Sequence, residues 1–258
     1  MQRRNYHSGD TVTRFNQRAD DYARYRPSYP PAAIDAIFDG LAPPPKLRIV
    51  DVGAGTGISS KLLAERGARV IAVEPNDEMR AVALGAGLDA RAGSAQALGL
   101  DAASADVIAC FQAFHWFAEP ATIAEFGRVL APGGRLAIVW NERDDGDPFT
   151  RGYGEIVDRF AKRTNLAGYA TAPEMFARLL PGTVFGEVRA RAFPNAQRLD
   201  RDGLLGRVRS TSYAPRSGDE ADVMLERLEA LFERFAGSGG SVEIVYQTEV
   251  YLVDKEVG

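Results

Sequence analysis

A glycine-rich stretch is the first part of the sequence whose residue types suit ligand binding. The segment 47–52, L-R-I-V-D-V, contains a short, nearly continuous apolar run, which is typical of a central parallel strand buried on both faces. Gly53, Gly55 and Gly57 follow at a spacing of two, and the segment 58–66 is predicted to be a helix. Because glycine lacks a Cβ atom, this turn can take positive φ and allow a ligand to approach closely. In open α/β sheets, ligands bind at such strand-to-helix junctions.

Two acidic residues accompany this turn. Asp51 lies two residues before the first glycine, and Glu74 ends the segment 69–74, R-V-I-A-V-E, which is predicted to be the second strand. A carboxylate at that strand end can accept hydrogen bonds from both ribose hydroxyls of a bound nucleoside. The pattern therefore favours a nucleoside-containing ligand. The alternatives are a tight turn that binds no ligand and, for Glu74, a solvated strand end.

The spacing of the glycines disfavours a dinucleotide loop. A G-x-G-x-x-G loop beginning at Gly53 and Gly55 requires a small residue at position 58, where this sequence has Ile58. The observed pattern, D-x-G-x-G-x-G, instead resembles motif I of the Rossmann-like S-adenosylmethionine (SAM) methyltransferases. SAM carries an ammonium group, which suits Asp51 directly or through water, and a carboxylate, which suits the glycine amides and the amino end of the helix.

The amino-terminal segment 13–31, T-R-F-N-Q-R-A-D-D-Y-A-R-Y-R-P-S-Y-P-P, extends this resemblance. Its aromatic and small residues fall at helical spacing until Pro27, and a second helix is predicted over 32–41. The segment resembles the opening of the type 11 small-molecule methyltransferases, including relatives of the trans-aconitate methyltransferases, where it folds over the cofactor as a lid. The resemblance implies lid contacts from Tyr22, Tyr25 and Arg26. The alternative is a docking helix whose aromatic rings pack on the sheet.

Two segments further along the chain match the same group. The segment 90–100, A-R-A-G-S-A-Q-A-L-G-L, resembles the part of the family that follows the third strand and meets the adenine edge. Gln96 stands where an acid is commoner, but its amide oxygen can still accept a hydrogen bond from the adenine amine. The segment 127–140, G-R-V-L-A-P-G-G-R-L-A-I-V-W, is predicted to be a helix end, a tight Pro-Gly-Gly turn and a buried fifth strand.

The sequence after the predicted fourth strand, 105–110, is the most informative about chemistry. Residues 111–117 read F-Q-A-F-H-W-F and do not match the N/D-P-P-Y/F sequence of methyltransferases that act on nucleobase amines or protein glutamine. The resemblance to the small-molecule branch places His115 and Trp116 beside the methyl group. A histidine with an unperturbed pKa would suit a general base near neutral pH. The alternative is that His115 orients a loop while Trp116 forms a wall of the adenine pocket.

The carboxyl-terminal part, from residue 144 onward, loses the alternation of strands and helices. Helices are predicted over 149–163, 172–180, 203–212 and 220–235, and strands over 185–193 and 241–254. In the family, an antiparallel hairpin closes the sheet, and inserted helices form a cap that varies with the substrate. Asn141, Arg207 and Tyr213 are candidate substrate contacts, and either Arg207 or Arg209 could hold a substrate carboxylate. The alternatives are a solvated turn for Asn141 and ordinary surface arginines.

The resemblance thus implies one complete set of site residues and no metal. His115 is the catalytic candidate, and the candidate substrate contacts are His115, Trp116, Asn141, Arg207 and Tyr213. The candidate cofactor contacts for SAM, or for its product S-adenosylhomocysteine (SAH), are Tyr22, Tyr25, Arg26, Asp51, Gly53, Ala54, Gly55, Thr56, Gly57, Glu74, Pro75, Asn76, Met79, Ser94, Ala95, Gln96, Phe111, Gln112, Ala113 and Trp116.

Composition sets limits on partners and compartment. The 258 residues are 45% hydrophobic and 26% charged, with a formal net charge of -4, so nothing in the charge favours a nucleic-acid or anionic-membrane partner. The single cysteine, Cys110, fits a reducing compartment. The first residues lack the apolar core of a signal peptide, so we expect a cytoplasmic protein, monomeric or homodimeric, that acts on a small molecule.

These patterns predict an α/β fold with a Rossmann-like, seven-stranded and mostly parallel sheet, helices on both faces, an antiparallel last strand and a helical cap. The expected organisation is lid helices over 1–41, a SAM-binding core over 42–143, and cap insertions with the closing hairpin over 144–258, all within one structural domain. The favoured function is a SAM-dependent small-molecule methyltransferase. A nicotinamide-dependent oxidoreductase and a non-catalytic SAM-fold binding protein are the alternatives.

Overall fold

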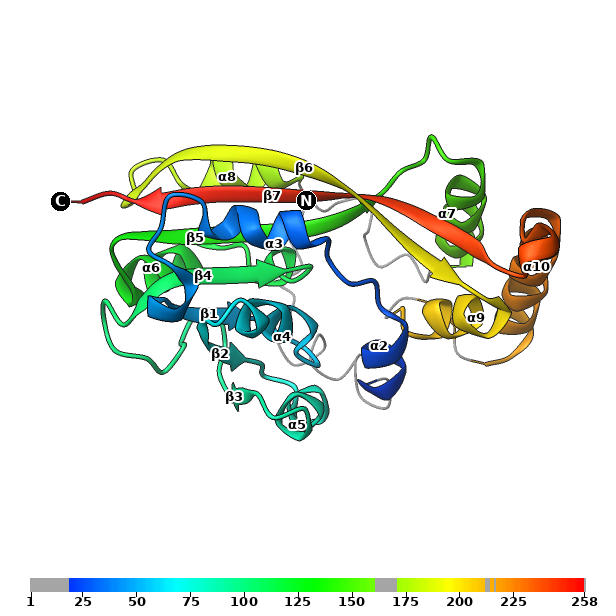
Figure 1. Ribbon diagram of the computed structural model, residues 1–258, viewed down its shortest axis with the longest axis horizontal. Coiled ribbons are helices and arrows are strands. Elements are labelled where there is room, and N and C mark those ends of the chain that lie inside the picture. The colour runs from blue at the N-terminus through cyan, green and yellow to red at the C-terminus, as the bar shows by residue number, and fades with distance from the viewer. Residues whose placement is uncertain (1–18, 161–170, 212–213, 216, 258) are drawn as a thin grey trace, which may run out of the picture.

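The computed structural model describes residues 19–160, 171–211, 214–215 and 217–257, and its frame is one seven-stranded sheet (Figure 1). The strand order is β3-β2-β1-β4-β5-β7-β6. β1 to β5 pair in parallel, whereas β7 runs antiparallel to both β5 and β6. The strands are β1 Arg48–Val52, β2 Arg69–Val73, β3 Asp89–Arg91, β4 Ala105–Phe111, β5 Leu130–Arg143, β6 Phe185–Leu199 and β7 Val242–Lys255. The predicted fold class is confirmed.

Helices cover the sheet on both faces and extend beyond one end of it. The α-helices are α2 Ala19–Tyr25, α3 Pro31–Phe38, α4 Ile58–Glu65, α5 Asp77–Gly85, α6 Pro120–Val129, α7 Pro148–Phe160, α8 Ala172–Leu179, α9 Arg201–Arg209 and α10 Asp219–Phe235. Short 3-10 helices cover Pro44–Lys46, Phe114–Trp116 and Gly237–Gly239. None of the helices in the described ranges is long and apolar enough to cross a membrane.

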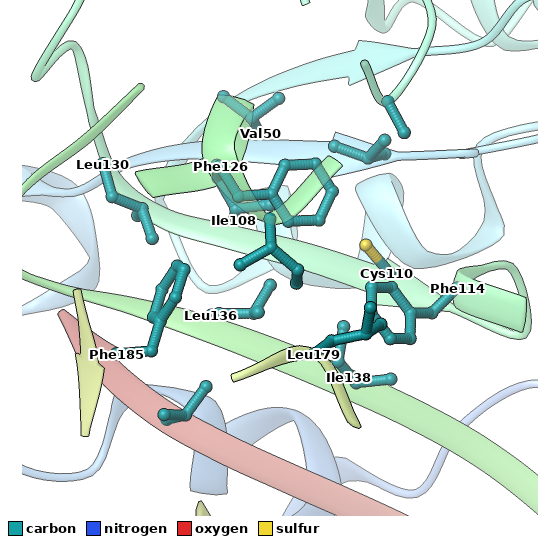
Figure 2. Close-up of a cluster of buried hydrophobic side chains, with 14 of the residues drawn as sticks. Val50, Ile108, Cys110, Phe114, Phe126, Leu130, Leu136, Ile138, Leu179 and Phe185 are labelled. Atoms are coloured by element: carbon teal, nitrogen blue, oxygen red, sulfur yellow. The ribbon is translucent and has the colours of Figure 1, made fainter. Parts of the chain in front are cut away.

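Alternate residues of the central strands build two separate cores, because successive side chains of a strand point to opposite faces. Ile108 and Cys110 of β4 point to one face and pack with α6 and α8 residues such as Phe126 and Leu179 (Figure 2). The opposite face of β4 packs against α3 and α4. Burial of this apolar surface on both faces explains why β1 and β4 are apolar runs and do not alternate.

The helices of the carboxyl-terminal half form a cap with an apolar cluster of its own. α7, α9 and α10 pack around residues such as Tyr153, Leu204 and Leu228, together with Ile244 near the start of β7. β6 and β7 run past the end of the parallel strands to reach these helices (Figure 1). The cap therefore rests on the extended β6–β7 hairpin, which places its helices beyond the carboxyl ends of the parallel strands.

Among the predicted boundaries, two in the strands differ most from the structure. The strand predicted over 185–193 continues to Leu199, because its pairing with β7 extends along the ribbon to Val242. The predicted Pro-Gly-Gly turn lies inside β5, where a register shift sets Leu130 opposite Ala105 and Arg135 opposite Val107. The extra residues between Leu130 and Arg135 form an irregularity in the strand, and Gly133, with φ +72°, accommodates it.

The lid helix α2 packs on cap helix α9, whereas residues 1–18 of the predicted lid lie outside the described residues. The ring of Tyr25 lies directly over Gly206, where an added Cβ atom would be 2.4 Å from Tyr25 Cε2. Gln197 Nε2 donates to the Tyr25 carbonyl at 2.8 Å, and Arg26 Nη2 donates to the Ser210 carbonyl at 3.1 Å. The lid is therefore joined to α9 by close packing and one polar bond, and to β6 by a second polar bond.

We expect Gly206→Ala to destabilise the protein by about 1–3 kcal/mol, because the new methyl group overlaps the Tyr25 ring and forces it to move. Urea unfolding followed by circular dichroism measures the free energy of unfolding. Gly85→Ala is the matched control, since an added Cβ at this helical glycine meets nothing within 4 Å. Equal stabilities of the two variants would show that α2 does not pack on α9 as described.

Candidate active site

The glycine turn connects β1 to α4 at the carboxyl edge of the sheet, as predicted. Gly53, Gly55 and Gly57 all have positive φ, at 70°, 58° and 87°. The Gly53 and Ala54 amides donate to the Val73 carbonyl at 2.9 and 3.3 Å, which ties the turn to the end of β2. An added Cβ at Gly53 would lie 2.7 Å from Ala113 Cβ. Glycine is thus required at position 53 by its own φ and by the neighbouring loop after β4.

The Glu74 carboxylate lies at the tip of β2 and holds the turn in place. Its Oε2 accepts from the Gly55 amide at 2.9 Å and its Oε1 accepts from the Asn76 amide at 2.8 Å. The side chain is only 7% exposed, and this burial raises the pKa of the carboxyl group, against the two amide bonds that lower it. Each carboxylate oxygen can accept a further hydrogen bond, so Glu74 can bind a ligand while it shapes the turn.

A cavity, here called the central cavity, lies over the glycine turn and the tips of β1, β2 and β4. It brings together fourteen of the predicted cofactor contacts: Tyr22, Gly53, Gly55, Glu74, Pro75, Asn76, Met79, Ser94, Ala95, Gln96, Phe111, Gln112, Ala113 and Trp116. Val52, Val73, Gly93 and Phe117 also line it and were not predicted. Thr56 and Gly57 are buried within the turn and do not line it.

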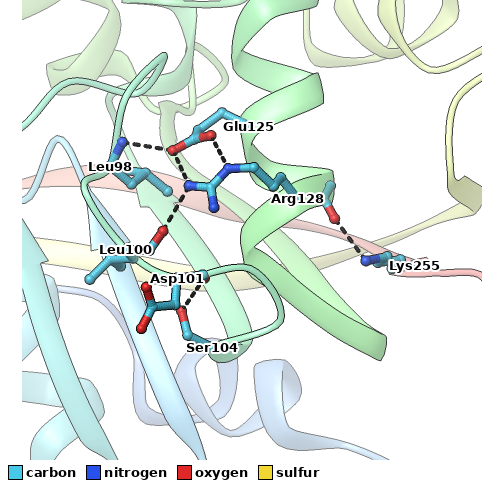
Figure 3. Close-up of polar contacts among 8 residues, drawn as sticks. Leu98, Leu100, Asp101, Ser104, Glu125, Arg128 and Lys255 are labelled. Carbon is cyan, nitrogen blue, oxygen red and sulfur yellow. Dashed lines mark hydrogen bonds and ion pairs between the residues drawn. The ribbon is translucent and has the colours of Figure 1, made fainter.

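Helix α6 fixes the segment that follows β3, which carries Ser94, Ala95 and Gln96. Glu125 accepts from the Leu98 amide at 2.9 Å, and Arg128 donates to the Leu100 carbonyl at 2.8 Å (Figure 3). Gln96 Nε2 donates to Glu119 Oε1 at 2.7 Å, so the donor end of this amide already has a protein partner. The segment is therefore held in position by two neighbouring side chains of α6 and by the residue before that helix.

Asp51 lies beneath the turn and does not line the central cavity. The side chain is fully buried, and its Oδ2 accepts from Ser59 and Ser60, each at 2.6 Å. Its Oδ1 has no hydrogen-bond partner among the described residues. Burial raises the pKa of Asp51 from 3.8 to about 6, against the serine bonds that lower it. Asp51 therefore does not reach a cofactor ammonium group in the central cavity directly. A contact through a water molecule is compatible with this geometry.

Gln112 stands at the end of β4, where the central cavity meets two others. Its backbone has φ +52°, which is rare for a residue with a side chain. The backbone amide donates to the Val139 carbonyl, and the side-chain Nε2 donates to the Asn141 carbonyl, both at 2.9 Å. The Gln112 side chain thereby continues the hydrogen bonding to β5 beyond the point where the Gln112 backbone turns away from that strand. These two bonds hold the strained conformation in place.

The second cavity, here called the polar cavity, lies between the glycine turn, the lid and the cap. Arg26, Tyr29, Asn141, Arg207 and Tyr246 line it, with Ala54 and Ser59 from the turn and α4. Sequence reasoning missed Tyr29 and Tyr246. Only the pairing of β5 with β7, which sets Arg143 opposite Tyr246, shows that this tyrosine lies at the strand tips. Tyr213 lies outside the described residues.

Asn141 connects the lid, the sheet and the hairpin. Its Oδ1 accepts from Thr248 Oγ1 at 2.5 Å and from Asn195 Nδ2 at 3.1 Å, and its Nδ2 donates to the Ser28 carbonyl at 3.1 Å. Asn141 therefore positions these three segments, and its role in substrate binding stays a prediction. The side chain is 7% exposed, so the solvated turn weighed for it is wrong.

The side chains of His115 and Trp116 face different cavities, because successive residues of the short 3-10 helix Phe114–Trp116 point in different directions. Trp116 lines the central cavity, whereas His115 lines a third hollow with Trp140, Glu142, Glu249 and Tyr251, here called the acidic hollow. Burial lowers the pKa of His115 from 6.5 to about 4. The condition under which His115 would suit a general base near neutral pH, an unperturbed pKa, is therefore not met, and the imidazole is neutral at pH 7.

Comparison with known proteins identifies the family. A family model described as a methyltransferase domain matches residues 50–138, the range that carries the glycine turn, Glu74 and the tip of β4. An uncharacterized methyltransferase-like protein of Schizosaccharomyces pombe is 32% identical over 255 residues, which cover 94% of this chain and 95% of that protein. The chain belongs to the methyltransferase family.

One further relative matches part of the chain, and a solved structure shares its fold. An uncharacterized methyltransferase of Mycobacterium tuberculosis is 44% identical over 153 residues, covering 58% of this chain and 61% of the relative. A solved structure from Anaeromyxobacter dehalogenans, described as a proposed type II methyltransferase, has a TM-score of 0.61 at 24% identity and covers 90% of this chain and 98% of that one. This likeness confirms the Rossmann-like fold.

We expect the stability of this methyltransferase to fall by up to about 3 kcal/mol between pH 4 and pH 7 through Asp51 alone. Over this range Asp51 loses its proton at a lower pH in the unfolded state than in the folded state, because folding raises the pKa of Asp51 to about 6. Asp51→Asn should remove this component, so the difference between wild-type and variant free energies of unfolding should change with pH. Asp145→Asn, at an exposed acid, is the control. Parallel profiles for wild type and Asp51→Asn would contradict the raised pKa.

Proposed function

We propose that this methyltransferase uses SAM as its methyl donor and a small molecule as its acceptor. The observation that carries the proposal is the Glu74 carboxylate, which lines the central cavity beside the glycine turn. A carboxylate at this strand tip suits the two ribose hydroxyls of a nucleoside. Gly55, whose amide donates to that carboxylate, has no Cβ atom, so a ligand can approach the turn closely there.

The residues of the central cavity fit an adenosyl group. Glu74 would hold the ribose, while Met79, Trp116 and the segment 94–96 would enclose the adenine. When bound, SAM supplies a methyl group on a sulfonium that is already a good leaving group. The protein would contribute binding, orientation of the acceptor and exclusion of water under the lid. Orientation of this kind is worth about 7–11 kcal/mol in model reactions, more than a base usually adds.

A small acceptor is supported by the enclosure of the site and by the charge of the chain. Lid helix α2 and cap helix α9 cover the strand tips, and the formal net charge of -4 gives no support for a nucleic-acid partner. The acidic hollow adjoins the central cavity at Gln112 and is the place we propose for the acceptor. His115 is neutral there and, with a pKa of about 4, is a weak base. An acceptor that needs little help with proton removal therefore fits best.

Two of the earlier alternatives are less well supported. A nicotinamide-dependent oxidoreductase would also use a glycine turn and an acid after β2, but the loop spacing at Ile58 and the family membership disfavour it. A non-catalytic SAM-binding protein would retain the same cavity, so only turnover with an acceptor distinguishes it. The single cysteine and the charge support a cytoplasmic enzyme, which we include in the proposal.

Calorimetric titration tests the cofactor directly. We expect SAH to bind with a dissociation constant on the order of 1 μM, equivalent to about -8 kcal/mol, and NADH to show no binding. Binding of NADH with enhanced fluorescence, together with no heat from SAH or SAM, would reverse the assignment.

We expect Glu74→Ala to weaken SAH binding by about 1.5–3 kcal/mol, the usual cost of losing a hydrogen bond to a charged group. Part of this loss will come from the turn, because the carboxylate also holds the Gly55 amide. Glu74→Gln keeps a hydrogen-bond acceptor and the shape of the side chain, so we expect it to weaken SAH binding less than Glu74→Ala. Glu78→Ala, at an exposed acid of α5, is the control. Unchanged affinity in Glu74→Ala would remove this residue from the binding site.

A further inference from the structure

We propose that Glu142 and Glu249 of the acidic hollow determine the specificity for the acceptor and select a small molecule that carries a positive charge, such as a protonated amine. This inference rests on the proposed function, because it assigns a chemical class to the acceptor of that same methyl transfer. It concerns the group by which the acceptor is held. The atom that receives the methyl group would lie nearer Gln112, where the hollow adjoins the central cavity.

The acidic hollow has the size and the position of an acceptor site. Its volume is about 630 Å³, within the range of about 300–1,000 Å³ that small-molecule sites occupy. Gln112 lines both this hollow and the central cavity, and the neighbouring residues His115 and Trp116 line one of them each. A small molecule in the hollow would therefore lie next to a ligand in the central cavity.

One wall of the hollow comes from two paired strands, β5 and β7. Trp140 of β5 pairs with Glu249 of β7, and Glu142 and Tyr251 each lie two residues further along their own strand. Because side chains alternate between the two faces of a sheet, these four residues point to the same face. All four line the hollow. The wall thus combines two carboxylates with two aromatic rings.

The charge that lines this hollow is negative. None of its described lining residues is a lysine or an arginine, and His115 is neutral at pH 7, because burial lowers its pKa to about 4. Arg143 follows Glu142 in the chain but does not line the hollow, and its Nη2 donates to both oxygens of Asp158, at 3.2 and 3.1 Å. The hollow therefore favours a cation and would repel a carboxylate.

The two carboxylates of the wall also act on each other. The Glu142 side chain is exposed in part, but desolvation by the surrounding protein raises the pKa of its carboxyl group, and the negative charge of Glu249 raises it further. Arg143 acts in the opposite direction. Like charges on neighbouring strands are unfavourable. A bound cation would relieve this repulsion, which gives a positively charged acceptor an advantage over a neutral one.

The two aromatic rings support the same choice. Tyr251 donates its hydroxyl hydrogen to Glu249 Oε2 at 2.7 Å, which holds that carboxylate in place. The carboxylate keeps further acceptor capacity, because its two oxygens offer about four lone-pair sites. The rings of Trp140 and Tyr251 lie edge to face, with their centroids 6.1 Å apart. The face of an aromatic ring attracts a cation, so this wall can hold a charged nitrogen by both kinds of contact.

The test compares three ligands of similar shape and different charge. At pH 7, 2-phenylethylamine is a cation, 2-phenylethanol is neutral and 3-phenylpropanoate is an anion. Titration of each ligand, followed by saturation-transfer NMR with and without saturating SAH, measures its dissociation constant. The variants are Glu142→Gln and Glu249→Gln, which keep a hydrogen-bond acceptor and the shape of the side chain. Glu243→Gln, at an exposed acid of β7 outside the hollow, is the matched control.

We expect wild type to bind the amine at least about 10-fold more tightly than the alcohol or the acid. Glu142→Gln and Glu249→Gln should each weaken amine binding about 3- to 10-fold and leave alcohol binding unchanged. Both variants should bind SAH as wild type does, because neither carboxylate lines the central cavity. Circular dichroism and the melting temperature check folding, and if one variant does not fold, the other decides the question.

Several results would overturn the inference. They are binding of the alcohol or the acid as tight as that of the amine, no binding of the amine at millimolar concentration, and unchanged amine affinity in both variants. Protein that binds SAH but shows no preference for the amine would keep the proposed function and lose only this inference. Protein that binds the amine through Glu142 and Glu249 but binds no SAH would have a cation site without a methyl donor, so the proposed function would fail and the acceptor role with it.

Discussion

The site depends on one buried carboxylate that accepts two backbone amides. Glu74 joins the end of β2 to the glycine turn through Gly55 and to the start of α5 through the Asn76 amide. Asn76 in turn caps α5, since its Oδ1 accepts from the Met79 amide at 2.9 Å. A charged acceptor forms stronger bonds than a neutral one, which offsets part of the cost of burying Glu74. The floor of the central cavity is therefore fixed before any ligand binds.

A second polar network extends this fixed edge from β4 to the hairpin. The Gln112 side chain bonds to the Asn141 carbonyl, and the Asn141 side chain bonds to Ser28, Thr248 and Asn195. The lid connection, the tip of β5 and the β6–β7 hairpin thus meet at one asparagine. Because buried amides need all these partners, a displacement of one segment disturbs the others. The network explains how a cap with its own apolar cluster keeps a fixed position relative to the strand tips.

The division of the molecule into a sheet and a cap has a consequence for chemistry. The sheet supplies the tips of β1, β2 and β4 and the central cavity, while the lid and the cap each supply one arginine, Arg26 and Arg207, to the polar cavity. Gln112 borders both cavities and the acidic hollow, so its strained backbone lies where cofactor and acceptor would meet. Such strain is common at functional sites, where a rigid surrounding structure holds it.

The sequence by itself determined the fold class, the glycine turn and the place of Glu74, because apolar runs and glycine spacing reflect local backbone geometry and strand burial. It could not place Tyr246 and Arg207 on the wall of one cavity, since only the pairing of β5 with β7 and the packing of α9 on the lid bring them there. It could not separate His115 from Trp116 or foresee the pKa values of His115 and Asp51. Side-chain direction and desolvation depend on segments far apart in the chain, and only tertiary structure brings those segments together.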